Sequence, residues 1–217
     1  MNWQALAGLN PEQQRLVMST MARRSFRKGD TLVFEGDVGD SLHLIERGKV
    51  AIRTSTPMGE IVTLTVLGAG ESFGEQALLA DDARRTASVV ALEPVETRVL
   101  HRVDFERLRA QHPSVERFLV EVMSAQVRRL STMVLEAMYL PADRRVVRRI
   151  GDLAEIYRGS APVVDIPVRQ EDLATMAGTT RQTANQVLKQ LEDDGVVTLR
   201  RGGVAIVQLD ELRRRAR

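Results

Sequence analysis

The stretch that decides the fold reads Phe73-Gly-Glu-Gln-Ala-Leu-Leu-Ala-Asp-Asp-Ala-Arg-Arg-Thr-Ala-Ser-Val-Val-Ala91. Arg85 follows Glu75 by ten residues, with a short apolar run between them and a β-prone run after Thr86. An Arg can pair with two phosphodiester oxygens at once, and a carboxylate can accept a hydrogen bond from a ribose hydroxyl. A Gly lets the backbone approach a ligand closely. Together these residue types suit a cyclic nucleotide.

This stretch resembles the phosphate-binding cassette of cyclic-nucleotide-binding domains. The resemblance implies that Glu75 holds the ribose 2′-hydroxyl and Arg85 the cyclic phosphate, while Thr86 adds a hydroxyl to phosphate or base. The alternative is a surface turn with a charged rim, Asp81-Asp82-Ala83-Arg84-Arg85. The expected nucleotide site comprises Leu64, Phe73, Gly74, Glu75, Gln76, Ala77, Arg85, Thr86, Ala87, Gln126, Leu130, Ser131 and Thr132.

The purine preference is open. In the family, hydroxyls from a long helix reach the purine, one from each subunit, and alignment from the cassette puts Leu130-Ser131 at those places. The adjacent Thr132 offers a second hydroxyl, and Thr86 suits adenine or guanine. We expect cAMP, with cGMP as the alternative.

Composition excludes several classes of protein. Of 217 residues, 43% are apolar and 28% charged, and none is cysteine, which excludes disulfides, iron–sulfur clusters and thiolate metal sites. His43, His101 and His112 show no ligand spacing, so we expect no metal. No apolar run reaches the length of a membrane span, and the first residues lack a signal-peptide pattern. We therefore expect a cytoplasmic protein without membrane contact.

Short strand-like runs follow the short helices that we expect over residues 3–24. Between Gly and Asp turn signals they cover Thr31–Phe34, Ser41–Ile45, Lys49–Ser55, Ile61–Leu67, Thr86–Ala91 and Glu96–His101. This spacing predicts an antiparallel sandwich or barrel. The segment Glu35–Val50 resembles the strand pair that precedes the cassette in the same β-roll family. His43 alternates with Leu42 and Leu44, which predicts an outward-facing side chain.

A long helix is predicted from Pro113 to about Leu140. A heptad-like seam is formed by Leu119, Met123, Gln126, Leu130, Met133, Ala137 and Leu140. A second stripe comprises Val115, Phe118, Val122 and Ala125. Two stripes indicate two partners, the β-roll and a second subunit, and favour a parallel homodimer. The alternative is a helix buried within one monomer.

Pro141 ends this helix and Asp143 is expected to cap the next, so residues 140–143 are the expected hinge. Helix, strand, helix, Gly-containing turn, helix and hairpin then follow, over Arg144–Tyr157, Val163–Ile166, Gln170–Met176, Ala177–Thr179, Thr180–Asp193 and the pair Val196–Arg200 and Val204–Gln208. This order is typical of a winged helix-turn-helix. Residues 143–217 hold 14 Arg and Lys against 11 Asp and Glu, whereas the preceding residues hold 17 against 18.

The run Arg169–Gly195 closely resembles the DNA-reading motif of the Crp/Fnr regulators. The resemblance now covers the whole chain and implies an α+β fold. We expect a cyclic-nucleotide-binding β-roll over residues 1–112, a dimerisation helix and hinge over 113–142, and a winged helix-turn-helix over 143–217.

The second helix of the motif has two faces. Its expected buried face comprises Ala184, Val187, Leu188 and Leu191. The opposite face carries Arg, Gln and Asn, which hydrogen-bond to guanine and adenine edges. The expected DNA contacts are Arg169, Thr179, Thr180, Arg181, Gln182, Asn185, Gln186, Lys189, Arg200 and Arg201. Solvated polar residues or a protein-binding winged helix are the alternatives.

One departure concerns DNA specificity. Relatives that read the half-site TGTGA carry Arg, Glu and Arg at three positions where this chain has Arg181, Gln182 and Gln186. Only the first is kept, so the guanine contact is expected and the rest of the half-site is in doubt.

Two rival functions remain. Gly70-Glu-Ser-Phe-Gly74 matches the nucleophile elbow of serine hydrolases, with Ser72 as nucleophile, but an elbow needs a parallel strand before it and a helix after it. A regulator that is independent of nucleotide, or that senses another effector, is the nearer alternative. We expect that the protein is not an enzyme. We expect a homodimeric bacterial regulator that binds palindromic double-stranded DNA and contacts RNA polymerase.

Overall fold

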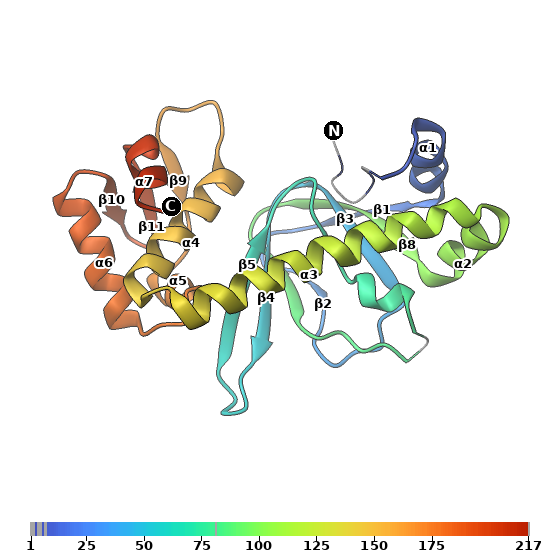
Figure 1. Cartoon of the computed structure of the whole chain (residues 1–217), viewed down its shortest axis with the longest axis horizontal. Helices are drawn as coiled ribbons and strands as arrows, with labels where there is room; N and C mark the ends of the chain where they lie inside the picture. Colours follow the sequence, from blue (N-terminus) through green and yellow to red (C-terminus); the bar gives the residue numbers. More distant parts are fainter. Residues whose placement is uncertain (1–2, 4–5, 7, 81, 217) are drawn as a thin grey trace. The chain divides into compact units, whose positions relative to one another are not determined.

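The computed structural model describes residues 3, 6, 8–80 and 82–216, so Asp81 of the cassette lies outside the described residues. Two compact units are present (Figure 1). The first comprises Met1–Ser55 and Leu67–Leu130, and the second Thr56–Val66 and Ser131–Arg217. Antiparallel strands, a long helix and a C-terminal helix-turn-helix confirm the predicted α+β fold class. The domain boundaries after residues 112 and 142 remain predictions.

Helix α1 (Pro11–Thr20) begins at a capping box. The Asn10 side chain accepts from the Gln13 N–H at 2.9 Å, and the Gln13 side chain accepts from the Asn10 N–H at 3.0 Å. The short helices predicted over residues 3–24 do not extend past Thr20, because β1 (Ala22–Phe26) follows. Most side chains of β1 are exposed, so no alternation marks it in the sequence, and its backbone pairing with β8 forms the strand.

Strands form two sheets ordered β1-β8-β3-β6 and β2-β7-β4-β5. The pairs β1–β8, β3–β8 and β4–β7 are antiparallel. Each predicted run contains a strand, whereas β1 and the two-residue β6 were not predicted. The remaining strands are β2 (Thr31–Val33), β3 (Ser41–Arg47), β4 (Val50–Ser55), β5 (Ile61–Leu67), β6 (Ser72–Phe73), β7 (Ser88–Ala91) and β8 (Val95–His101).

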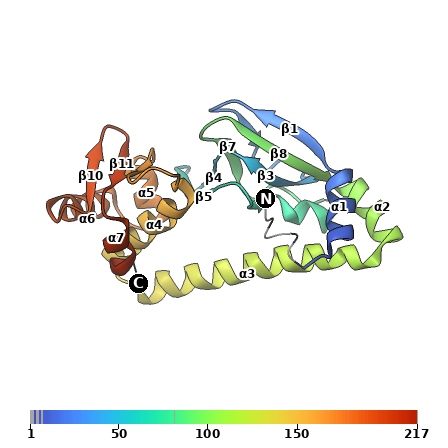
Figure 2. The same cartoon turned by 90° about the horizontal axis from the view of Figure 1, so that it is seen from above.

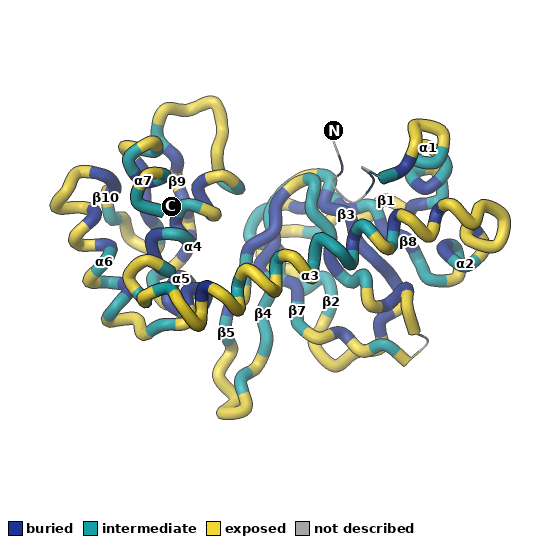
Figure 3. The backbone as a smooth tube through the Cα atoms, viewed as in Figure 1, coloured by how far each residue is buried: buried dark blue, intermediate teal, exposed yellow. Residues whose placement is uncertain are grey.

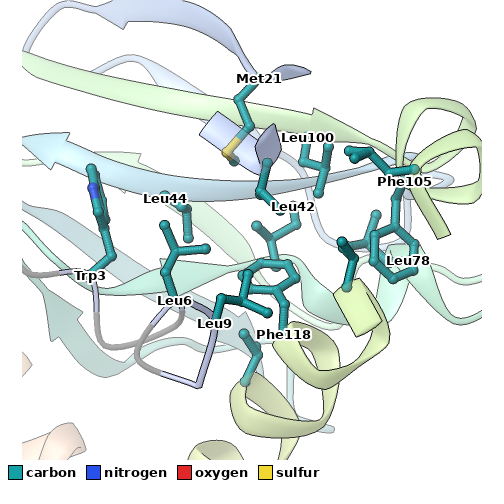
Figure 4. Close-up of a cluster of buried hydrophobic side chains, with 14 residues drawn as sticks. Trp3, Leu6, Leu9, Met21, Leu42, Leu44, Leu78, Leu100, Phe105 and Phe118 are labelled. Atoms are coloured by element: carbon teal, nitrogen blue, oxygen red, sulfur yellow. The ribbon is translucent and has the colours of Figure 1, made fainter. Parts of the chain in front are cut away.

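A buried apolar cluster forms the core of the first unit (Figure 4). Leu42 and Leu44 of β3 and Leu100 of β8 meet Phe105 of α2 (Arg102–Gln111) and Phe118 of the long helix. Removing one of these aromatic side chains would cost about 3–5 kcal/mol of folding free energy. A second cluster, which includes Ile45, Val50 and Phe73, contains residues from both sheets. The strands around the cassette therefore rest on a packed core.

His43 differs from its prediction because it is buried. Its ring stacks on Phe73 with 4.8 Å between centroids, and Nδ1 lies 3.3 Å from the Thr97 hydroxyl. Burial lowers the pKa of His43 to about 3, and the positive charges of Arg85 and His101 act in the same direction. The first five residues of β3 are all buried, so alternation did not identify an exposed face.

The long helix α3 (Glu116–Tyr139) follows a 3₁₀ turn, η3 (Pro113–Val115), and is continuous (Figure 2). The predicted second stripe packs inward, since Val115, Phe118 and Val122 are buried. The predicted seam is partly wrong: Leu119 packs against the core, and Gln126 lines a cavity. The large apolar residues exposed along α3 are Val120, Val127, Leu130, Val134, Leu135, Met138 and Tyr139 (Figure 3). An α-helix drifts against a strict seven-residue repeat, so the residues of the predicted seam do not all lie on the exposed face of α3.

The second unit contains a three-stranded sheet ordered β10-β11-β9. Asp143 does not cap α4: Pro141 occupies the N-cap position, and Asp143 lies in the first turn, where its charge is still favourable. Helix α5 and the turn after it confirm the predicted helix-turn-helix. The elements are α4 (Ala142–Tyr157), β9 (Val164–Ile166), α5 (Gln170–Met176), α6 (Arg181–Asp193), β10 (Val197–Arg200), β11 (Gly203–Ile206) and α7 (Leu209–Arg215).

Candidate effector pocket and nucleic-acid interface

Arg85 is 8% exposed, and its guanidinium is held by backbone and hydroxyl oxygens. Its Nη1 donates to the Ser41 carbonyl at 2.8 Å and its Nη2 to the Ser41 hydroxyl at 3.0 Å. Nη1 also lies 3.5 Å from the Gly74 carbonyl. The structure therefore brings together Gly74 and Arg85, which the sequence predicted to share a site.

Gly74 has a conformation and a neighbourhood that only glycine suits. Its φ is +81°, and a Cβ placed there would lie 2.4 Å from Arg85 Nη1 and 2.8 Å from the Ser41 carbonyl. Glu75 follows at once, at the start of the 3₁₀ helix η2 (Glu75–Leu78). The tight turn thus places Glu75 directly after the glycine whose carbonyl lies near the Arg85 guanidinium.

The charges around Arg85 oppose its burial. Burial lowers the pKa of the guanidinium, while the carboxylates of Asp40, Glu75 and Asp37 raise it, leaving the pKa below its ordinary value. The ion pair with Asp40 is loose, at 3.8 Å. A buried cation without a close carboxylate is costly unless an anion compensates it. The arrangement therefore suits a bound anion.

Asp40 connects Arg85 to a histidine. One oxygen of Asp40 accepts from the Ser41 hydroxyl at 2.8 Å, and the other lies 3.4 Å from His101 Nδ1. Partial burial raises the pKa of Asp40, but the Ser41 hydroxyl, His101 and Arg85 together hold it below its ordinary value. Sequence reasoning treated Gly39-Asp40 only as a strand divider and missed both Asp40 and Ser41.

Backbone hydrogen bonds fix the second half of the cassette. The Arg85 N–H donates to the Asp37 carbonyl at 2.9 Å, and the Arg85 carbonyl accepts from the Gly36 N–H at 2.8 Å. The Gly39 N–H donates to the Ala83 carbonyl at 2.7 Å. This pairing sets the position from which Arg85 enters the site.

A cavity of about 160 Å³ in the first unit adjoins the cassette. It brings Glu75 and Gln126 together, as predicted, and also has Glu71 and Arg129 on its wall. Burial raises the pKa of Glu71, although the Gly68 N–H, 2.7 Å from its carboxylate, and Arg129 act in the opposite direction. The cavity is lined by Gly70, Glu71, Ser72, Glu75, Glu121, Val122, Ala125, Gln126 and Arg129.

The other predicted ligand residues do not line this cavity. Phe73 and Ala77 are buried in the fold, whereas Gln76 and Thr86 are exposed and Ala87 is half-buried. Leu130 is 49% exposed on α3. The remaining three, Leu64, Ser131 and Thr132, belong to the second unit.

Ser72 does not lie at a nucleophile elbow. It belongs to β6, which pairs antiparallel with β3, with Ser72 opposite Leu44. An elbow requires a parallel strand that leads into a helix at the nucleophile. The local fold therefore does not support the hydrolase interpretation.

Helix α6 presents the two predicted faces. Ala184, Leu188 and Leu191 are buried, and Val187 is half-buried. The opposite face exposes Arg181, Gln182, Gln186 and Lys189, with Asn185 half-buried. Thr180 is the N-cap and accepts from the Thr183 N–H at 3.2 Å. Thr179 is half-buried in the preceding turn.

Four arginines line one cavity of about 620 Å³ in the second unit. Arg169 precedes α5, Arg181 begins α6, Arg200 ends β10, and Arg201 follows in the wing turn. The wall is completed by Gln170, Glu171, Gly202 and Gly203. Cations from three elements in one hollow beside the exposed face of α6 suit a phosphate backbone.

Two contacts in this unit escaped sequence reasoning. Arg200 Nη1 is 2.6 Å from the carboxylate of Asp165 on β9. Arg145 of α4 donates to the carbonyls of Leu140 at 2.7 Å, Ala177 at 2.8 Å and Gly178 at 2.9 Å. Arg145 thereby ties the helix-turn-helix turn to the end of α3. Its position in a run of arginines gave no signal of this role.

Clusters of metal-binding side chains and membrane-spanning helices are both absent from the described residues. Within these residues, no group of three or more His, Cys, Asp or Glu side chains could hold a metal ion. In the same part of the chain, no helix has the length and apolar character needed to cross a membrane.

Comparisons with known proteins agree with both halves of the geometry. Residues 23–112 match the family model of the cyclic nucleotide-binding domain, and residues 144–215 match that of the Crp-like helix-turn-helix domain. The chain is 35% identical to the cyclic AMP receptor protein of Thermus thermophilus, over 92% of this chain and 90% of the relative. It is 28% identical to the CRP-like cAMP-activated global transcriptional regulator of Mycobacterium tuberculosis, over 97% of this chain and 95% of the relative.

Solved structures give the same result. The crystal structure of Thermus thermophilus catabolite activator protein matches with a TM-score of 0.56 and 33% identity, covering 98% of each chain. FixK2 from Bradyrhizobium japonicum matches with a TM-score of 0.75, covering 89% of this chain and 96% of FixK2. Its 17% identity shows likeness of fold alone.

Proposed function

Because the chain belongs to the Crp/Fnr family of transcription regulators, we propose that it is a homodimer whose DNA binding is controlled by cAMP bound in the first unit. The observation that carries the proposal is the buried Arg85, whose guanidinium lies at the Gly74-Glu75 turn and, among the described residues, forms only the loose ion pair with Asp40. Such a cation is placed for a singly charged phosphodiester. The names of the Thermus and Mycobacterium relatives support cAMP, with cGMP as the alternative.

Each cassette residue has a proposed role. Arg85 pairs with the cyclic phosphate while Ser41 keeps its guanidinium in place. Glu75 accepts a hydrogen bond from the ribose 2′-hydroxyl, and Thr86 adds its exposed hydroxyl. No covalent chemistry is involved, so the ligand acts only through its different affinities for two conformations of the protein.

The base and the dimer are linked in this proposal. The apolar side chains exposed along α3, including Val127, Leu130 and Val134, would be covered by the same helix of a second copy. Ser131 and Thr132 lie beside Leu130 and would then reach the purines. Nucleotide binding would shift the two α3 helices and thereby reset the spacing of the two recognition helices.

In the proposed complex, α6 enters the major groove of double-stranded DNA, where Arg181 reads guanine. Lys189 and Arg201 contact phosphates. Gln182 and Gln186 favour adenine, so the palindromic operator differs from TGTGA-N6-TCACA. The regulator would act in the bacterial cytoplasm together with RNA polymerase.

Selection of binding sites from random DNA duplexes tests this proposal. With cAMP present, the full chain should enrich a palindrome whose half-site contains guanine opposite Arg181. Enrichment should fall without nucleotide. A palindrome recovered equally well in both conditions would favour the nucleotide-independent alternative. Recovery of unchanged TGTGA-N6-TCACA would contradict the roles assigned to Gln182 and Gln186.

A further inference from the structure

An acidic side chain stands beside the arginine-lined cavity of the second unit. Asp165 Oδ1 lies 2.6 Å from Arg200 Nη1, and the two side chains remain 62% and 56% exposed. Arg200 lines the cavity together with Arg169, Arg181 and Arg201. The carboxylate therefore neutralises one of the four cations that would face a phosphate backbone.

The fold of the wing sheet places this pair on its solvent side. Val164 and Ile166 of β9 are each 3% exposed, so Asp165 between them points outward. In the register, Asp165 lies opposite Ala205 of the central strand β11, and Arg200 lies opposite Gly203. The two charged residues are thus held on the outer strands, two positions apart along β11.

Stability does not account for the pair. An ion pair between two exposed side chains contributes little to folding free energy, because water and salt screen it. The same carboxylate matters more when a polyanion approaches, because it repels phosphates and occupies a donor of Arg200. No carboxylate of the described residues is within ion-pair distance of Arg201. The wing therefore presents one masked and one unmasked arginine.

We propose that Asp165 is an electrostatic brake on DNA binding, which weakens sequence-independent attachment of the wing to phosphates by masking Arg200. This inference rests on the proposed DNA-binding function. Phosphate contacts supply most of non-specific binding, whereas base contacts supply specificity. When the phosphate contacts contribute less binding free energy, the base contacts of α6 determine a larger share of the choice of binding site.

Fluorescence anisotropy of the full chain with a labelled mixed-sequence duplex of about three helical turns tests the proposal. Asp165→Asn keeps the shape and an acceptor for Arg200 but removes the charge. We expect about three- to tenfold tighter binding at low salt, which is the effect of unmasking one positive charge about 4 Å from a phosphate in the dielectric of water. The slope of log affinity against log salt should steepen by about one unit.

Two further variants make the result specific. Asp210→Asn removes the same charge from a 93% exposed carboxylate on α7, whose partner Arg213 also binds Glu155 of α4, and it should leave affinity within about twofold. In an Arg200→Ala background, Asp165→Asn should lose most of its effect, because the masked cation is gone. Circular dichroism should show unchanged folding for all of these exposed substitutions.

Each result decides the matter. Equal gains from Asp165→Asn and Asp210→Asn would mean that only net charge matters, and would overturn the proposal. Weaker binding by Asp165→Asn would mean that Asp165 holds Arg200 in position for DNA, which also overturns it. If the wild type binds no duplex at any salt concentration, the DNA-binding function itself fails; if it binds and Asp165→Asn is unchanged, only the brake fails.

Discussion

Replacing Gly74 by Ala should separate the cost of a left-handed backbone from the cost of displacing Arg85. A non-glycine residue at positive φ costs roughly 1–2 kcal/mol. At Gly74 the added Cβ would also lie 2.4 Å from Arg85 Nη1, so the guanidinium must move away from the Ser41 carbonyl. A hydrogen bond to a charged group contributes about 1.5–3 kcal/mol. We therefore expect Gly74→Ala to lower the free energy of unfolding by about 2.5–5 kcal/mol.

Gly29 provides a matched control. Its φ is +91°, and a Cβ there would meet nothing within 4 Å, so Gly29→Ala should cost only the roughly 1–2 kcal/mol of backbone strain. The single tryptophan, Trp3, lies in the core of the first unit, and its fluorescence during urea unfolding reports on that unit. Calorimetry should show cAMP binding retained in Gly29→Ala and lost in Gly74→Ala. Equal destabilisation of the two variants with binding retained in both would refute the described contact of Gly74 with Arg85.

Three further predictions address the dimer, the DNA contacts and the response to pH. Leu130→Glu should dissociate the dimer and abolish tight DNA binding, because two like charges would be buried across the seam; a wild type that sediments as a monomer at micromolar concentration would contradict this. Arg181→Ala should cost on the order of 1–3 kcal/mol of binding free energy on the selected operator and relax the choice of one base pair per half-site. Lys189→Ala should instead weaken binding to specific and random DNA alike and flatten its salt dependence. Equal losses of affinity for both DNAs in Arg181→Ala would contradict a role of Arg181 in base recognition. Because the folded pKa of His43 is about 3, protonation of His43 should lower the free energy of unfolding as pH falls below about 6.5, by up to roughly 1.4 kcal/mol per pH unit until about pH 3. Urea unfolding of His43→Gln should show a shallower dependence on pH, and identical slopes for wild type and His43→Gln would contradict the buried neutral imidazole.

Most helices and strands could be predicted because their signals, turn residues and periodic burial, lie within the element itself. Gly195, with φ +70°, follows α6 where the sequence places its end. The alternation in β7 and the 3.6-residue period of α6 each reflect burial of one face of a single element. By contrast, β1 has mostly exposed side chains and exists through its pairing with β8. No pattern within five residues could reveal that pairing.

The residues of the candidate sites also divide into those predicted from one local segment and those that join the site from elsewhere in the chain. Gly74, Glu75 and Arg85 were predicted because their spacing within one segment resembles a known cassette. Ser41 and Asp165 were missed because each joins its site from a distant part of the chain, and neither residue type is distinctive at its position. Arg145 was missed for a related reason. It positions the turn by donating hydrogen bonds to three backbone carbonyls, and every residue has a carbonyl, so the sequence does not distinguish these partners.

Binding of a cyclic nucleotide to the first unit is tested most directly by isothermal titration calorimetry of the full chain with cAMP and with cGMP. We expect saturable binding of cAMP at one site per chain, and loss of most of that binding in Arg85→Ala, whose fold should be retained. Absence of detectable binding of either nucleotide to the wild type would contradict the proposed control of this regulator by a cyclic nucleotide.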